Sequence, residues 1–242
     1  MIKFFRKIRY NLMSENKTGK YFKYAIGEIV LVVIGILIAL QINTWNTNKN
    51  NSIKEQLYLK SFHEDIQVNL NQLDRVIRKS SKTISAADSI LRFKENELSI
   101  KGLELIENLI MGTANYTIFL SQEGTINDIF GSGDLALITN DSIRRSMVNW
   151  SAELKYLKEY ETLGKNNQLE YIDFLSKNTK LYKLSLQKKF ADEKTITKLL
   201  NDDSFLNLVS GQKRMARVLN GLYLAQKEKI TNLATLVNQE TN

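Results

Sequence analysis

The sequence predicts an all-α protein in which a single N-terminal transmembrane helix precedes an elongated antiparallel helical bundle. Three observations lead to this prediction. The 242 residues include no proline, so every segment is free to run as an uninterrupted helix. Residues 24–42 form one apolar run. Farther along the chain, apolar residues recur every three or four positions, which places them on one face of each helix and favours a bundle.

The apolar run at residues 24–42 is the predicted transmembrane helix. Its 19 residues approach the roughly 20 that cross a bilayer, and its strongly polar members, Glu28 and Gln41, lie near its ends. Tyr21, Phe22 and Tyr24 flank one end and Trp45 the other, as aromatic residues do at membrane interfaces. Two alternatives stay open: a buried core helix, and a signal peptide, although no small-residue cleavage pattern follows the run.

Basic residues before this run predict its orientation. Residues 1–23 hold seven lysines and arginines and one acid, which is +6 of the net charge of +8. Three lysines follow the run at positions 49, 54 and 60, and an excess of basic residues marks the cytoplasmic side. We therefore expect a bacterial inner membrane protein with residues 43–242 in the periplasm. Those residues carry only +3, so the charge does not predict a nucleic-acid partner.

In residues 1–13, the apolar residues Phe4/Phe5, Ile8 and Leu12 recur at helical spacing with basic residues between them, which predicts an amphipathic helix on an anionic membrane surface. A mitochondrial-type presequence is the alternative. The basic residues assigned to the membrane surface are Lys3, Arg6, Lys7, Arg9, Lys20 and Lys23.

The predicted organisation has four parts. They are a cytoplasmic segment (1–23), the transmembrane helix (24–42), an asparagine-rich hinge (43–52) and an extracytoplasmic helical domain (53–242). Within the domain, residues 53–93 form a long helix, Lys94–Ile100 a turn and 103–111 a short helix.

The elements that follow are expected in this order. Tyr116–Leu120 is β-prone but is expected to begin a helix, and Gly131–Gly133 breaks the chain. Asn140 or Asp141 caps a helix that Gly164 interrupts, and Asp202 or Asp203 caps the last helix.

Several stretches of the sequence resemble a family of uncharacterised bacterial single-pass membrane proteins, known only as a domain of unknown function. These stretches are Met1–Arg9, Ser14–Lys17 and Tyr24–Asn43 with Trp45, followed downstream by Ser132–Asn140 with Ile143 and Arg144. The resemblance implies an anchored protein with a mostly helical outer part. It implies no activity, cofactor or catalytic residue.

The residue types present exclude several kinds of catalytic site. With no cysteine and one histidine, the chain lacks disulfides, thiolate sites and multi-histidine metal sites. Gly131–Ala136 fits a dinucleotide-binding pattern but lacks the strand that this motif requires, so it indicates a turn. His63–Gln67 begins like a zinc-protease helix but has Gln67 where the second ligand should be.

Neighbouring acids do not predict a catalytic pair either. The pairs Glu64/Asp65, Asp192/Glu193 and Asp202/Asp203 point about 100° apart on a helix and are typical of helix caps and solvated faces. We therefore expect no metal, no cofactor and no enzymatic activity.

Two features of the apolar run indicate association within the membrane. Glu28 is a costly intramembrane acid that would pair with Lys20 or Lys23 or contact a partner helix. Small residues permit close helix approach, and the predicted association face consists of Gly27, Leu31, Gly35 and Ala39, spaced four apart.

The function predicted from these features is a non-enzymatic anchored protein that presents a helical periplasmic domain for envelope assembly, with the membrane and a second copy or another envelope protein as partners. The alternative is a sensory or ligand-binding module that signals through a partner, because the cytoplasmic part is too short to signal alone. A membrane-tethered enzyme is the third hypothesis.

Overall fold

In the computed structural model, the described residues are 10, 18–93, 102–186 and 188–241. They are predominantly helical and include no strand, so the predicted all-α fold class is confirmed. The expected helix at residues 1–13 and the turn at Lys94–Ile100 lie outside these residues, apart from Tyr10. The chain divides into two compact units, Met1–Glu55 and Gln56–Asn242.

The first unit carries the apolar run on helix α2 (Thr18–Leu91). The large apolar side chains from Ile26 to Ile42 are exposed, and no residue in the most apolar 18-residue stretch is buried. By length and composition, this helix is able to span a membrane. Residues 43–52 are helical within α2, and the hinge that we expect there stays a prediction.

The second unit contains the rest of α2 and all the later helices. These are α4 (Leu103–Thr113), α5 (Gly124–Ser132), η2 (Asp134–Leu137), α6 (Asp141–Asn178), η3 (Leu181–Leu186), α7 (Glu193–Leu200) and α8 (Asp203–Thr241).

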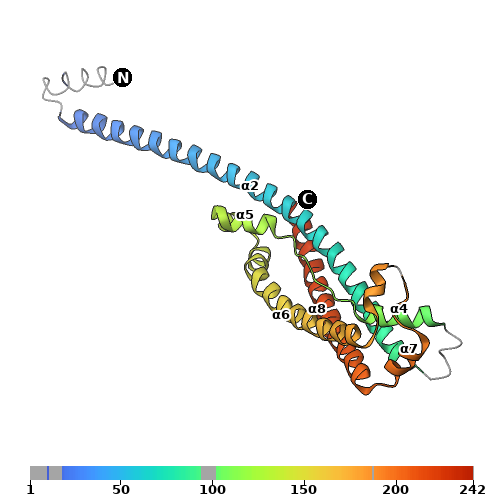
Figure 1. The fold of residues 1–242 in the computed structure, drawn as a ribbon. Helices are drawn as coiled ribbons and strands as arrows, with labels where there is room; N and C mark the ends of the chain where they lie inside the picture. Colours follow the sequence, from blue (N-terminus) through green and yellow to red (C-terminus); the bar gives the residue numbers. More distant parts are fainter. Residues whose placement is uncertain (1–9, 11–17, 94–101, 187, 242) are drawn as a thin grey trace. The chain divides into compact units, whose positions relative to one another are not determined.

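Three long helices, α2, α6 and α8, form the bundle in the second unit (Figure 1). The Lys227 ammonium lies 2.7 Å from the Asp74 carboxylate, and Lys213 pairs with Asp88. A higher residue number on α2 is thus paired with a lower residue number on α8. These two helices are therefore antiparallel, as predicted.

Helix α8 also packs antiparallel against α6, which runs without a break through Gly164. The expected interruption there is wrong. A Cβ atom at Gly164 would lie 3.0 Å from Leu219 Cδ1 and 3.4 Å from Met215 Cγ, both on α8. The glycine is therefore at a close contact between two helices, a role that its sequence neighbours Lys165–Asn167 did not reveal.

The buried apolar residues form two clusters. In the first, α2, α5, α6 and α8 contribute, and the rings of Phe62 and Trp150 meet edge to face with centroids 6.1 Å apart. In the second, the end of α2, α4, α7 and the adjoining parts of α6 and α8 surround Tyr171, Phe190 and Phe205.

Residues 115–123 join α4 to α5 without helical structure, so the expected helix start at Tyr116–Leu120 is wrong. Along this segment, buried Thr117 and Phe119 alternate with exposed Ile118 and Leu120. This two-residue alternation is the pattern of extended backbone. Residues 115–123, called the extended segment below, are held by side chains from all three long helices.

Candidate functional site

The predicted association face lies on the first unit of α2. Leu31 is exposed, and a Cβ atom at Gly27 or Gly35 would meet no atom within 4 Å. With Ala39, these residues follow at steps of four along one helix, so they share a face. Glu28 is half-buried on the neighbouring face. Whether the face contacts a partner stays a prediction.

Most of the predicted membrane-surface residues are not described. Lys3, Arg6, Lys7 and Arg9 lie outside the described residues, and so does the side chain of Lys20. Lys23 is exposed at the start of the apolar run.

The glycine pattern Gly131–Ala136 forms a turn between helices, as expected. Helix α5 ends at Ser132, and Gly133 adopts φ 75°, a left-handed conformation that glycine reaches at little cost. The Asp134 carboxylate then accepts a hydrogen bond from the Tyr58 hydroxyl at 2.7 Å. Within the described residues no strand precedes the turn, so the dinucleotide motif has no sheet to complete it.

The neighbourhood of His63 is also structural. His63 Nε2 and Gln67 Nε2 are 3.5 Å apart, and the Asp65 carboxylate accepts a hydrogen bond at 2.8 Å from the Thr125 N–H at the start of α5. Across the described ranges, no three histidine, aspartate or glutamate side chains converge as a metal site.

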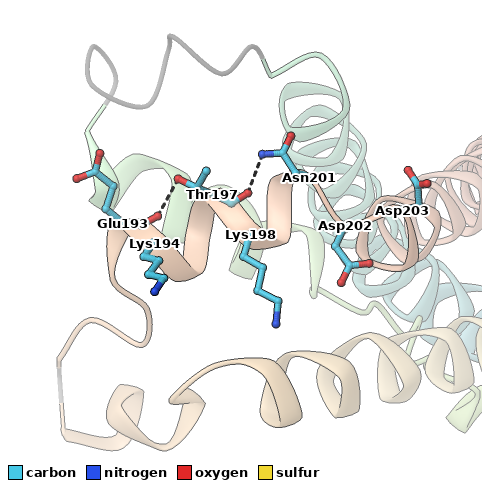
Figure 2. Close-up of a pocket in the computed structure, with 7 residues that line it drawn as sticks. All are labelled: Glu193, Lys194, Thr197, Lys198, Asn201, Asp202 and Asp203. Carbon is cyan, nitrogen blue, oxygen red and sulfur yellow. Dashed lines mark hydrogen bonds between the residues drawn. The ribbon is translucent and has the colours of Figure 1, made fainter.

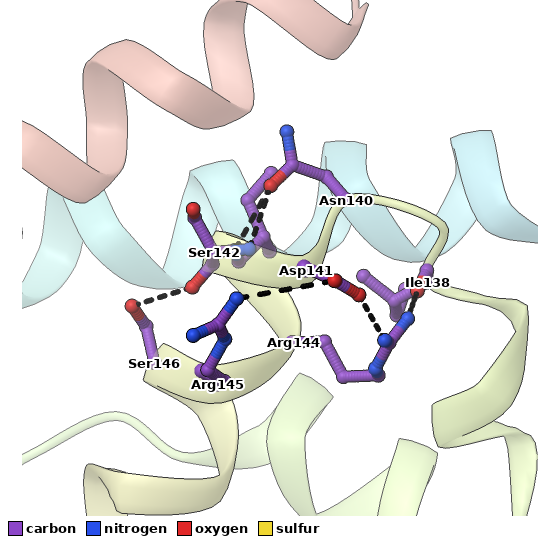
Figure 3. A network of polar contacts seen from close by, with 8 residues as sticks. Ile138, Asn140, Asp141, Ser142, Arg144, Arg145 and Ser146 are labelled. Atoms are coloured by element: carbon purple, nitrogen blue, oxygen red, sulfur yellow. Dashed lines mark hydrogen bonds and ion pairs between the residues drawn. The ribbon is translucent and has the colours of Figure 1, made fainter.

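Asn140 and Arg144, two polar residues of the Ser132–Arg144 stretch that carries the family resemblance, lie at the start of α6 (Figure 3). Asn140 is the N-cap, and its side-chain oxygen accepts hydrogen bonds from the backbone of Ser142 at 3.0 Å and of Ile143 at 3.2 Å. Arg144 donates to the Ile138 carbonyl at 2.7 Å and pairs with Asp141. These contacts fix the first turn of α6 and the chain that enters it.

Two of the acid pairs supply helix caps, as expected. The Asp192 carboxylate accepts the Thr195 N–H at 2.8 Å at the start of α7. Hydrogen bonding from the Thr195 side chain, and then from its backbone N–H, lowers the pKa of Asp192. Asp202 accepts the Ser204 N–H at 2.8 Å at the start of α8.

A surface depression of about 980 Å³ lies along α7 and the turn into α8 (Figure 2). It is lined by Glu193, Lys194, Thr197, Lys198, Asn201, Asp202 and Asp203. Thr197 and Asn201 donate to carbonyl oxygens four residues earlier, at 2.9 and 3.0 Å. The depression is open, carries both charges and has the character of a solvated surface.

The buried polar residues converge instead on the extended segment. Asn69, fully buried on α2, donates to the Gln122 carbonyl at 2.9 Å and accepts the Gln122 N–H at 2.7 Å. One side chain thus satisfies both backbone groups of a residue that has no neighbouring strand.

Glu161 holds the middle of the extended segment from α6. Its buried carboxylate accepts the Phe119 N–H at 2.7 Å and the Tyr223 hydroxyl at 2.9 Å. The Tyr223 hydroxyl also lies 3.1 Å from the Thr117 carbonyl. Burial raises the pKa of Glu161 against the opposing effect of these hydrogen bonds, and burial together with Glu161 raises the pKa of Tyr116.

A second buried acid, Glu107 on α4, also binds backbone N–H groups of an irregular segment. Its carboxylate accepts the backbone N–H groups of Phe190 at 2.9 Å and Ala191 at 3.1 Å. Nearby, the Tyr171 hydroxyl donates to the Ile110 carbonyl at 3.0 Å. These buried polar groups bind the backbone of irregular segments and so order the fold.

The comparisons with known proteins give one match. The model of a family of unknown function (DUF6090) matches residues 28–213, which is more than half of the sequence. No curated protein and no solved structure matches the chain. The matched range includes most of the apolar run and the polar residues that hold the extended segment. The chain therefore belongs to the DUF6090 family.

Proposed function

We propose that this protein is a non-enzymatic, single-pass protein of a bacterial inner membrane, whose periplasmic domain of residues 53–242 assembles with a second copy or with another envelope protein. The observation that carries the proposal is the exposure of the apolar run: its most apolar stretch has no buried residue. A contiguous surface of this kind needs lipid or a partner to cover it. The basic residues at 1–23 support a cytoplasmic N-terminus.

The use of the buried acids supports a non-enzymatic role. A catalytic acid or base must reach a substrate proton. Glu161 and Glu107 are buried, and their carboxylates accept hydrogen bonds from backbone N–H groups. Both residues therefore serve the fold.

Assembly through the membrane is tested by disulfide crosslinking. Because the chain has no cysteine, single variants Gly35→Cys and Ala39→Cys report only their own contacts. Val33→Cys and Leu37→Cys, on the other side of the helix, are the matched controls. In oxidised membranes we expect covalent dimers at 35 and 39 and few at 33 and 37. Equal crosslinking at all four positions, or none, would contradict self-association through this face.

A sensory module remains a second candidate because of a groove between α6 and α8. The groove encloses about 290 Å³ and includes the Glu153–Lys229 ion pair at 2.9 Å. Trp150 lines it, and among the described residues the buried indole N–H of Trp150 has no hydrogen-bond partner. Native mass spectrometry of the chain purified from its own membranes tests this candidate. Gln226 also lines the groove. A retained small molecule that Gln226→Leu removes would favour this candidate, and a chain that retains no small molecule would count against it.

A further inference from the structure

The loop between α6 and α7 exposes apolar side chains that the fold does not use. Tyr182 and Leu186 are 66% and 58% exposed, and Leu184 is 40% exposed. All three belong to η3, a helix of six residues. Such a concentration of exposed large apolar side chains on one short element indicates a surface that another phase or molecule covers.

The same loop is strongly basic. Residues 179–192, which join the two helices, hold four lysines and one acid, Asp192, whose carboxylate caps α7. Lys177 is paired with Asp173 at 2.6 Å, but in the described part of the chain the ammonium groups of Lys183, Lys188 and Lys189 have no acidic partner. Lys183 and Lys189 line a pocket of about 510 Å³, together with Asp192.

The loop is held firmly at its base. The Lys180 N–H donates to the Phe190 carbonyl at 2.9 Å, which closes the neck of the loop. The Phe190 ring is buried in the second core cluster, and Glu107 binds the Phe190 N–H. Because the neck is closed and anchored, the apolar and basic side chains between positions 180 and 190 are presented together at the surface.

We propose that this loop docks on an anionic phospholipid surface. Tyr182, Leu184 and Leu186 enter the boundary between headgroups and acyl chains, while Lys183, Lys188 and Lys189 contact lipid phosphates. Charge complementarity selects this occupant. A soluble polyanion would use the lysines but leave the apolar side chains in water, and an uncharged apolar partner would leave the lysines unpaired.

The site belongs to the end of the bundle where α2 finishes. Its base contacts the second core cluster, which includes Ala87 and Ile90 near the end of α2. Residue 56, at the other end of this unit, is near the end of α8, where Gln56 donates to the Glu240 carbonyl at 3.0 Å. Within this unit, the loop therefore lies at the end opposite residue 56.

An environment-sensitive dye on a single cysteine tests this proposal in the full chain. The chain has no cysteine, so Leu186→Cys carries one dye and Leu169→Cys, exposed on α6, carries the control dye. Each chain is held in phosphatidylcholine nanodiscs and mixed with phosphatidylglycerol-containing or pure phosphatidylcholine vesicles. We expect a blue shift only for the dye at 186 with phosphatidylglycerol. No shift at 186, or an equal shift with pure phosphatidylcholine or at 169, would overturn the proposal.

Charge reversal then tests the role of the lysines. In the Leu186→Cys chain, Lys183→Glu with Lys188→Glu should weaken vesicle binding by at least roughly 20-fold, since each lysine near a charged surface is worth about fivefold. Lys155→Glu with Lys165→Glu, two exposed positions on α6, makes the same charge change and should alter binding less than about twofold. Equal losses in both pairs would overturn the proposal. Unchanged circular dichroism verifies that each variant is folded.

Inorganic triphosphate distinguishes a lipid surface from a soluble anion. We expect it to compete with vesicles without shifting the dye at 186, because it offers no apolar phase. If triphosphate binds and vesicles do not, the site takes a soluble polyanion and the lipid proposal is wrong.

Discussion

Glu161 shows how a polar residue in the core can hold a fold together. Its carboxylate satisfies the N–H of Phe119, a residue that has no helix or sheet to do so. Glu161→Ala would leave that buried N–H without an acceptor and open a cavity, and we expect a loss of about 2–3 kcal/mol in the free energy of unfolding. Glu159→Ala, two positions away and exposed, should change it by less than about 0.5 kcal/mol. Equal effects would contradict this role.

Both variants are measured by urea unfolding in mild detergent. The chain has two tryptophans, Trp45 in the first unit and Trp150 in the core of the second. In a Trp45→Phe background, the fluorescence of Trp150 therefore reports the unfolding of the bundle alone.

The raised pKa of Glu161 gives the bundle a pH dependence. Because burial raises this pKa in the folded state, the folded chain binds the proton more tightly than the unfolded chain. The stability contributed by the protonated carboxyl is present below the ordinary glutamate pKa and is lost as the pH rises through the folded value. Glu161→Gln cannot titrate. The unfolding free energy of this variant should therefore rise relative to wild type from about pH 4 upward. A constant difference between pH 4 and 8 would contradict this.

Single residues show what the sequence signals and what it hides. The apolar stripe of α6 reaches Leu157 and would continue at Glu161, and on α2 Asn69 lies between buried Ile66 and Leu73. A polar residue at a core position is a signal that could have located both. Their partners could not have been predicted, because backbone groups 42 and 53 residues away meet them only in the folded chain.

At the scale of elements, the start of α6 depends on a side-chain cap. Asn140 accepts two backbone N–H groups of the first turn. Asn140→Ala should cost about 1 kcal/mol of unfolding free energy, while Asn140→Ser keeps an acceptor and should cost less than half as much. The midpoint of urea unfolding measures both. Equal losses would show that the cap contributes nothing.

The contact between α6 and α8 depends on the missing side chain of Gly164. Gly164→Leu would place atoms where Leu219 and Met215 already lie, and we expect a loss of about 1–3 kcal/mol in thermal or urea unfolding. The same change at Gly221, which is exposed on α8 with open space around it, should stabilise by about 0.5–1 kcal/mol because leucine favours helix. Stabilisation at both positions would contradict a close contact at Gly164.

Elements were predictable where the apolar period was long and uninterrupted. The fold class and the caps at Asn140, Asp192 and Asp202 follow from local chemistry. The roles of Gly164 and Tyr116–Leu120 could not be predicted in this way. A glycine that breaks a helix and a glycine that permits close approach of a neighbouring helix look alike in sequence. The β-prone Tyr116–Leu120 is extended because Asn69, Glu161 and Tyr223 supply the hydrogen bonds that a sheet would give.

In the whole molecule, an exposed apolar run precedes a bundle that has its own apolar core. The sequence was most informative about the run, because its length and flanking charges report directly on the bilayer. It was least informative about the lysine-rich loop between α6 and α7, residues 179–192. Its basic charge is visible in the sequence, but the exposure of Tyr182 and Leu186 is apparent only in the folded chain.

The accessibility of single cysteines to a membrane-impermeant thiol reagent tests whether the chain is anchored with its bundle outside the cytoplasm. Ser151 is a suitable reporter because it is exposed on α6. In intact bacterial cells with a permeabilised outer membrane, Ser151→Cys should label at once and Ser14→Cys only after lysis. Labelling of Ser14→Cys in intact cells with Ser151→Cys protected, or release of the chain from membranes by carbonate, would contradict the account.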